Sequence, residues 1–145
     1  MTAPVTFILT IASALVIFVA SQYFLKLVLE PISGLRRTLA DISSTTLVHQ
    51  AKITNGHADD AVGTRLHELS ARLRADAFEV RFYSQVAKIC GVPSQENIRS
   101  ACRALNWLST GMTPIKQEGL KKNWAEENTR TLEELGQLLG IDTKF

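Results

Sequence analysis

Five polar or basic side chains that could contribute to binding an anion lie on both sides of the turn signal at Gly91–Pro93, which is expected to form a corner between two helices. They are Arg81, Lys88, Ser94, Arg99 and Arg103. Guanidinium groups bind carboxylates and phosphates through paired hydrogen bonds, and a helix that begins after Ser94 would add backbone amides. The pattern therefore indicates an anion-binding or nucleotide-binding corner. The alternative interpretation is a packed helical corner whose basic side chains are solvated.

No motif for a chemical reaction accompanies this corner. The sequence has no phosphate-binding glycine loop, no HExxH pair and no nucleophile elbow. His49, His57 and His67 lack the spacing of metal ligands. Asp59 and Asp60 are neighbours, and neighbours on a helix point about 100° apart, so they suit a helix cap better than a catalytic pair. We therefore expect no catalytic residue, no metal and no cofactor, and we expect that the protein is not an enzyme.

Charge and cysteine content narrow the class of partner. The 145 residues carry 16 Lys and Arg against 14 Asp and Glu, a net charge of +2. A dedicated nucleic-acid binder would show a strongly basic face, so no nucleic-acid partner is expected. Cys90 and Cys102 form no CxxC pair and are interpreted as reduced, buried thiols. A disulfide or a reactive thiol is the alternative.

An uncharged segment precedes these features. Residues 5–25 contain no charged side chain, and as a helix they would span about 31 Å, close to the ~30 Å hydrocarbon core. Lys26, Arg36 and Arg37 follow the segment, and no Lys or Arg precedes it. The positive-inside rule predicts an outside N-terminus and a cytoplasmic remainder, which in a bacterium means the inner membrane. The three basic residues would contact lipid head groups. Residues 1–30 are thus the expected membrane anchor.

Residues 31–54 are expected to form a juxtamembrane amphipathic helix. Pro31 lacks an amide proton, so it should break the preceding helix and begin a new one. Apolar residues then alternate in steps of four and three, which predicts a seam for docking another helix. The seam consists of Ile32, Leu35, Leu39 and Ile42.

A second seam follows a turn at residues 54–58, whose Asn-Gly pair is a strong helix breaker. It consists of Val62, Leu66, Leu69 and Leu73. The turn would bring the two seams together antiparallel within one chain. Docking against the same helix of a second chain is the alternative. We expect Asp59 or Asp60 to cap the second helix, which would continue to Gly91.

The rest of the sequence also predicts helices. Ser94 should cap a helix that Gly111 ends, and Thr113-Pro114 should begin a last helix that Gly140 ends. The expected fold class is therefore all-α, with one N-terminal transmembrane helix followed by a small cytoplasmic helical bundle over residues 55–145.

Three stretches carry a resemblance to a known group. They are "LEPISGLRRTLADI" (29–42), "LHELSARLRA" (66–75) and "GVPSQENIRSACRALNWLS" (91–109). Together they resemble small bacterial single-pass membrane proteins of uncharacterised function. The resemblance implies a membrane-anchored cytoplasmic module and no site residues. In addition, "EPISGLRRTLADI" and "DDAVGTRLHELSARL" are similar to the two helices of a HAMP module, which implies signal relay.

These observations favour a non-enzymatic, membrane-tethered interaction or scaffold module. Its partners would be the lipid bilayer and either another protein or a second copy of the chain. One alternative is a membrane-anchored defence or toxin-like effector with a ligand-sensing helical tail, suggested by a polar face at Thr6, Thr10 and Ser13 and by the arginine-rich corner. A HAMP-like relay fragment is the other alternative.

Overall fold

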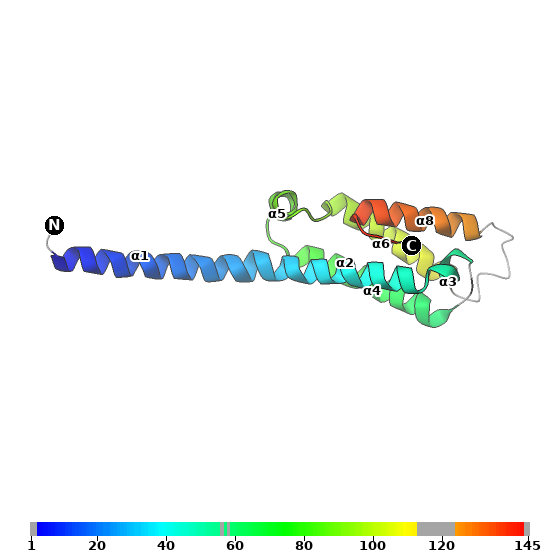
Figure 1. The fold of residues 1–145 in the computed structure, drawn as a ribbon, viewed down its shortest axis with the longest axis horizontal. Coiled ribbons are helices and arrows are strands. Elements are labelled where there is room, and N and C mark those ends of the chain that lie inside the picture. The colour runs from blue at the N-terminus through cyan, green and yellow to red at the C-terminus, as the bar shows by residue number, and fades with distance from the viewer. Residues whose placement is uncertain (1–2, 56, 58, 113–123, 144–145) are drawn as a thin grey trace.

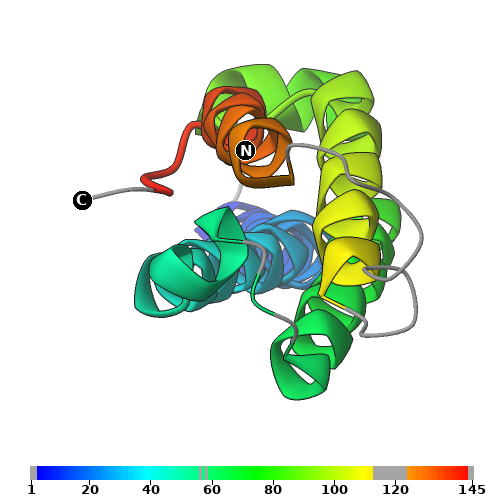
Figure 2. The same ribbon diagram turned by 90° about the vertical axis from the view of Figure 1, so that its right-hand side faces the viewer.

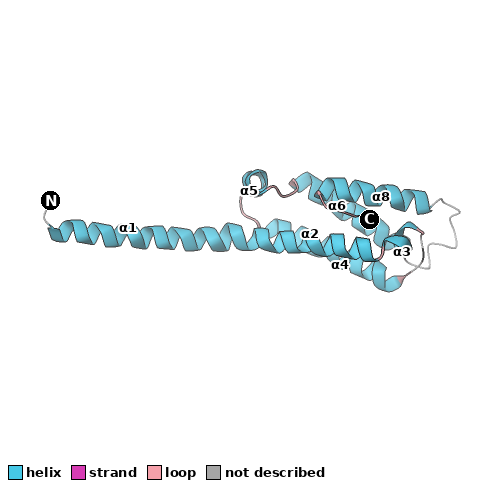
Figure 3. Cartoon of the chain, viewed as in Figure 1, coloured by secondary structure: helices cyan, strands magenta, loops and turns pink. Residues whose placement is uncertain are grey.

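The computed structural model describes residues 3–55, 57, 59–112 and 124–143. A long N-terminal helix leads into a bundle of shorter helices (Figure 1). Within the described residues only helices and the loops between them are present (Figure 3). The predicted all-α class is confirmed.

The long helix is a shaft made of three consecutive elements. Helix α1 (Ala3–Phe24) passes into a wide π-helical turn, η1 (Leu25–Leu29), and then into α2 (Glu30–Val48). The described side chains of α1 are all exposed, so this helix is not part of the bundle core. The continuous helix from Pro4 to Val48 is long and apolar enough to cross a membrane.

The predicted break at Pro31 is wrong, because the helix continues through it. In a regular α-helix the proline ring meets the carbonyl of residue 27 and leaves it without a donor. Here the preceding turn is π-helical, and the Glu30 N–H bonds to the Leu25 carbonyl, five residues back. The wider turn moves the carbonyls before Pro31 away from their α-helical positions, so the ring fits into an unbroken helix.

Four helices form an antiparallel bundle, seen end-on in Figure 2. They are α2, α4 (Asp60–Glu79), α6 (Gln95–Gly111) and α8 (Trp124–Leu139). The contacts between α2 and α4 show their opposite directions. Thr38 donates to Asp76 at 2.5 Å, whereas the later residue Asp41 pairs with the earlier Arg72 at 3.4 Å. The predicted helix over 31–54 is divided at His49 into α2 and the short α3 (Gln50–Thr54).

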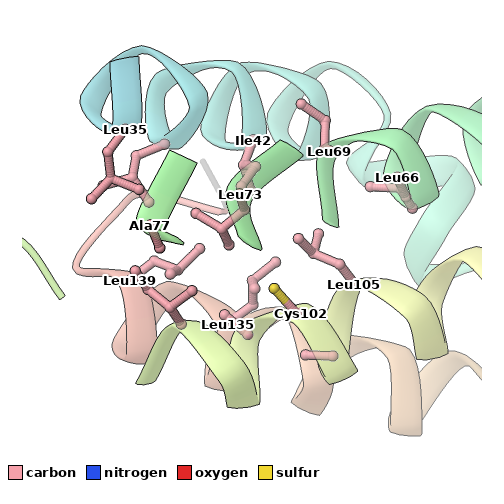
Figure 4. Close-up of a cluster of buried hydrophobic side chains, with 14 of the residues drawn as sticks. Leu35, Ile42, Leu66, Leu69, Leu73, Ala77, Cys102, Leu105, Leu135 and Leu139 are labelled. Atoms are coloured by element: carbon pink, nitrogen blue, oxygen red, sulfur yellow. The ribbon is translucent and has the colours of Figure 1, made fainter. Parts of the chain in front are cut away.

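Both predicted seams lie in the core of this bundle. Ile32, Leu35, Leu39, Ile42, Val62, Leu66, Leu69 and Leu73 are all buried. Leu105 of α6 and Leu135 and Leu139 of α8 belong to the same cluster, and Figure 4 shows the labelled side chains of the four helices converging. The structure therefore places the docking of the two seams inside one chain.

Helices α4 and α6 approach closely because their contact uses small residues. Ser70 Oγ donates to the Cys102 carbonyl at 3.1 Å, and Cys102 Sγ donates to the Ser70 carbonyl at 3.4 Å. At the other end, Ser109 Oγ donates to the Gly63 carbonyl at 2.7 Å. A Cβ at Gly63 would lie 3.1 Å from both the Ser109 carbonyl oxygen and Met112 Cβ. Glycine thus permits this separation.

The predicted helix from residue 62 to Gly91 is divided, contrary to the sequence analysis. Helix α4 ends at Glu79, Val80 is extended, and a separate helix α5 (Tyr83–Cys90) follows. Val80 and Tyr83 remain buried because the chain turns there. A longer α4 would run past Ile32, the first buried residue of α2, along a part of the shaft that has no buried residue. No local signal marks this turn.

Several predicted helix ends agree with the structure. Asp59 is the N-cap of α4, accepting from the Val62 N–H at 3.2 Å, and Lys52 pairs with it at 2.7 Å. The Lys52 ammonium group and the Val62 amide lower the pKa of Asp59. Gly91 and Gly140 both have φ of 63° and end their helices in the left-handed conformation that glycine favours. The predicted helix start at Thr113-Pro114 lies outside the described residues.

Candidate functional site

The five residues of the predicted anion-binding corner do not line one site. Ser94 Oγ is the N-cap of α6 and accepts from the Asn97 N–H at 3.1 Å. Arg99 lines a groove between α4 and α6, whereas Arg103 lines a separate hollow between α6 and α8. Arg81 and Lys88 are exposed on the turn before α5 and on α5 itself. The corner is therefore not a single anion pocket.

The corner is instead a well-packed connection between α5 and α6. Tyr83 is buried, and its hydroxyl donates to the Pro93 carbonyl at 2.7 Å. Burial raises the pKa of Tyr83 to about 12, so the hydroxyl remains a donor at neutral pH. Gly91 and Ser94 end one helix and begin the next, as the sequence analysis predicts.

The groove between α4 and α6 is the best-formed candidate site. Its volume is about 720 Å³, which suits a small ligand or one face of a peptide helix. The α4 side contributes Ala71, Arg74, Ala75, Ala77 and Phe78, and the α6 side contributes Gln95, Ile98, Arg99 and Cys102. The lining is thus mostly apolar, with one arginine from each helix.

The charge of this groove is positive. Arg74 and Arg99 are exposed, and neither forms an ion pair within the described part of the chain. Each guanidinium can bind a carboxylate or phosphate through two parallel hydrogen bonds. The groove can therefore hold a ligand that carries both apolar and anionic groups.

The described residues that line this groove include few reactive side chains. Its one nucleophilic group is Cys102, and burial raises the pKa of that thiol. A thiol with a raised pKa is protonated at neutral pH and is a poor nucleophile. Both cysteines are free in the structure. In the described ranges, no three His, Cys, Asp or Glu side chains gather as a metal site would require.

The residues predicted to meet lipid head groups divide into two kinds. Lys26 in η1 and Arg37 in α2 are exposed on the shaft. Arg36 has a structural contact that the sequence does not indicate: its Nη2 donates to the Cys90 carbonyl at 2.6 Å. This bond ties the end of α5 to α2.

Sequence reasoning missed Arg74 and the apolar groove beside it. The helix containing Arg74 was predicted, but its partner across the groove, Arg99, is 25 positions later. Only the packing of α4 on α6 brings the two arginines to one groove. The available signal was the presence of small residues on both helices, namely Ala71 and Ala75 on α4 and Ala101 on α6. Small side chains let two helices approach closely and leave space between them.

Fold and site together define an all-α protein in which one helix long and apolar enough to cross a membrane carries an antiparallel helical bundle with a basic, apolar-lined groove. Comparisons with protein-family models, with curated proteins and with solved structures gave no match.

Proposed function

We propose that this protein is a non-enzymatic, membrane-tethered adaptor of the bacterial inner membrane. The exposed α1 anchors it, and the cytoplasmic bundle binds a partner protein in the groove between α4 and α6. The observation that carries the proposal is this groove, with Arg74 and Arg99 beside an apolar lining. Its position on a bundle that shares helix α2 with the shaft supports a tethered binding role.

The partner that fits the groove is a segment with acidic and apolar side chains on one face, such as an amphipathic helix. Ala75 and Ile98 would contact its apolar side chains, and the two arginines would pair with its carboxylates. A purely apolar ligand would leave both guanidinium groups without an anionic partner, so charge complementarity favours the acidic segment.

Site-specific photo-cross-linking in bacterial cells tests this binding. A benzoylphenylalanine at Ala75 of the full chain is expected to cross-link a peptide in which Asp or Glu flanks apolar residues. Replacing Arg74 and Arg99 by Glu should lower the yield about tenfold or more, because a loss of ~1.4 kcal/mol in binding is a factor of ten. Changing the partner's acids to Lys should then restore it.

The matched control changes Arg65 and Arg130 to Glu, two exposed arginines outside the groove. This control should leave the cross-link unchanged. A cross-linked peptide without acidic residues, a cross-link to lipid alone, or an equal loss in both double variants would each contradict the proposal.

The tether carries a separate prediction about topology. Lys26, Arg36 and Arg37 follow the apolar segment, and this bias favours a cytoplasmic bundle. Alkaline phosphatase fused after Phe145 is therefore expected to be inactive, while a fluorescent protein at the same position should fold and emit. An active phosphatase fusion would reverse the proposed orientation.

The effector alternative gains no support from the proposed polar face on α1. Thr10 Oγ1 donates to the Thr6 carbonyl at 2.9 Å, and Ser13 Oγ donates to the Leu9 carbonyl. These hydroxyls thus have hydrogen-bond acceptors within their own helix.

A further inference from the structure

An apolar, basic surface lies on α5 and the turn before it. Phe82, the N-cap residue of α5, is 75% exposed, and Ile89, in the last turn of α5, is 85% exposed. Arg81 and Lys88 are exposed beside them. We call these four residues the α5 surface.

The backbone conformation at Phe82 is unusual for its residue type. Its φ of 54° is the only positive value at a residue other than glycine among the described residues. A bulky aromatic residue rarely adopts this conformation, and such strain is concentrated at functional sites. The strained turn holds an aromatic ring outside the core.

The α5 surface lies at the end of the bundle nearest α1. Figure 1 shows α5 beside the start of α2, and Figures 1 and 2 together show that α5 runs across the long axis of the shaft. The hydrogen bond from Arg36 to the Cys90 carbonyl holds it there. If α1 crosses a bilayer, α5 is thus parallel to the membrane surface.

The separation between α5 and the apolar part of the shaft is slightly greater than the thickness of a head-group layer. Leu25, Leu27 and Leu29 are exposed, and Arg36 follows Leu29 by seven residues, about 10 Å along a helix. The polar interfacial layer adds roughly 5–8 Å to each side of the hydrocarbon core. Long side chains on α5 therefore lie within reach of the lipid interface.

We propose that the α5 surface is a second membrane contact, in which Phe82 and Ile89 enter the boundary between head groups and acyl chains while Arg81 and Lys88 bind anionic head groups. This inference rests on the proposed membrane tether. Helix α5 contains no Asp or Glu, and apolar residues beside basic ones are typical of helices that lie in the lipid interface. With α1, this contact would hold the bundle at two points.

Nitroxide accessibility measurements on the full chain in lipid nanodiscs test the contact. Single cysteines for spin labelling replace Phe82 or Ile89 in a variant that carries Cys90→Ser and Cys102→Ala and retains helicity. Thr64 on the far half of α4 and Leu15 in α1 supply the aqueous and membrane controls. The readout is the ratio of collisions with oxygen to collisions with a water-soluble nickel chelate.

Labels at Phe82 and Ile89 are expected to give a several-fold higher ratio than Thr64, approaching that of Leu15. The ratio should fall when Arg81 and Lys88 are changed to Glu, and the fall should need phosphatidylglycerol in the nanodisc. Labels as accessible to nickel as Thr64 would overturn the second contact while Leu15 still reports a tether. Labels shielded from both reagents would overturn it in favour of a protein contact. A water-accessible Leu15 would overturn the tether itself.

Discussion

Changing Leu35 and Leu39 together to Asp is expected to unfold the helical bundle. Leu35 is fully buried and Leu39 nearly so, both between α2 and α4. Each leucine-to-alanine truncation in a core costs about 2–5 kcal/mol, and an unpaired carboxylate at such a site costs more. The double substitution therefore removes a large part of the ~5–15 kcal/mol by which a typical domain is stable against unfolding.

Circular dichroism of the full chain in detergent, followed by urea titration, measures this change. We expect the bundle's cooperative transition to disappear while the helical signal of α1 persists. The control is Ala40→Asp with Val48→Asp, two exposed positions on the same helix, which should change stability by about 0.5 kcal/mol or less each. If the double leucine variant kept the natural transition, the core between α2 and α4 would not hold the bundle together.

The second large effect is expected at Asn128. This side chain is fully buried in α8, and its Nδ2 donates to the Ile53 carbonyl at 2.8 Å. Asn128→Asp replaces the Nδ2 donor by a carboxylate oxygen, which would face the carbonyl oxygen of Ile53. Leaving a buried charge without a partner costs about 3–5 kcal/mol, so α8 should dissociate from α3 and the free energy of unfolding should fall by a similar amount at pH 7.

The effect of Asn128→Asp should depend on pH in a defined direction. Burial raises the pKa of the introduced carboxyl above its unfolded value of about 4. Below pH 4 the group is protonated in both states, so the difference from the natural chain is smallest. The difference grows as pH rises above 4 and levels off above the folded pKa. Gln137→Glu makes the same change at an exposed position of α8 and should show neither effect.

The sequence predicted those features of the fold that depend on neighbouring residues. The Asp59 cap, the Gly91 and Gly140 helix ends and the Ser94 cap all follow from the chemistry of one or two side chains. The apolar seams could also be predicted, because apolar residues in steps of four and three define one face of a helix whatever its partner is.

The features that the sequence did not predict depend on tertiary surroundings. The turn at Val80–Phe82 contains neither glycine nor proline, and it forms where the partner helix α2 stops being buried. The break expected at Pro31 was wrong because the π-helical turn before it makes room for the proline ring. The groove was missed because it depends on tertiary packing: Arg74 and Arg99 line one groove only when α4 packs on α6.

Because the helix continues unbroken through Pro31, it also limits how far the bundle can rotate about the axis of α1. If α1 crosses a membrane, a flexible linker would let the bundle rotate about the membrane normal. A single continuous helix instead fixes the rotation of the bundle relative to α1. Two chains whose spans met along one face would therefore present their grooves at a reproducible mutual angle. Inserting one residue into η1 would turn both grooves by about 100° without altering either surface.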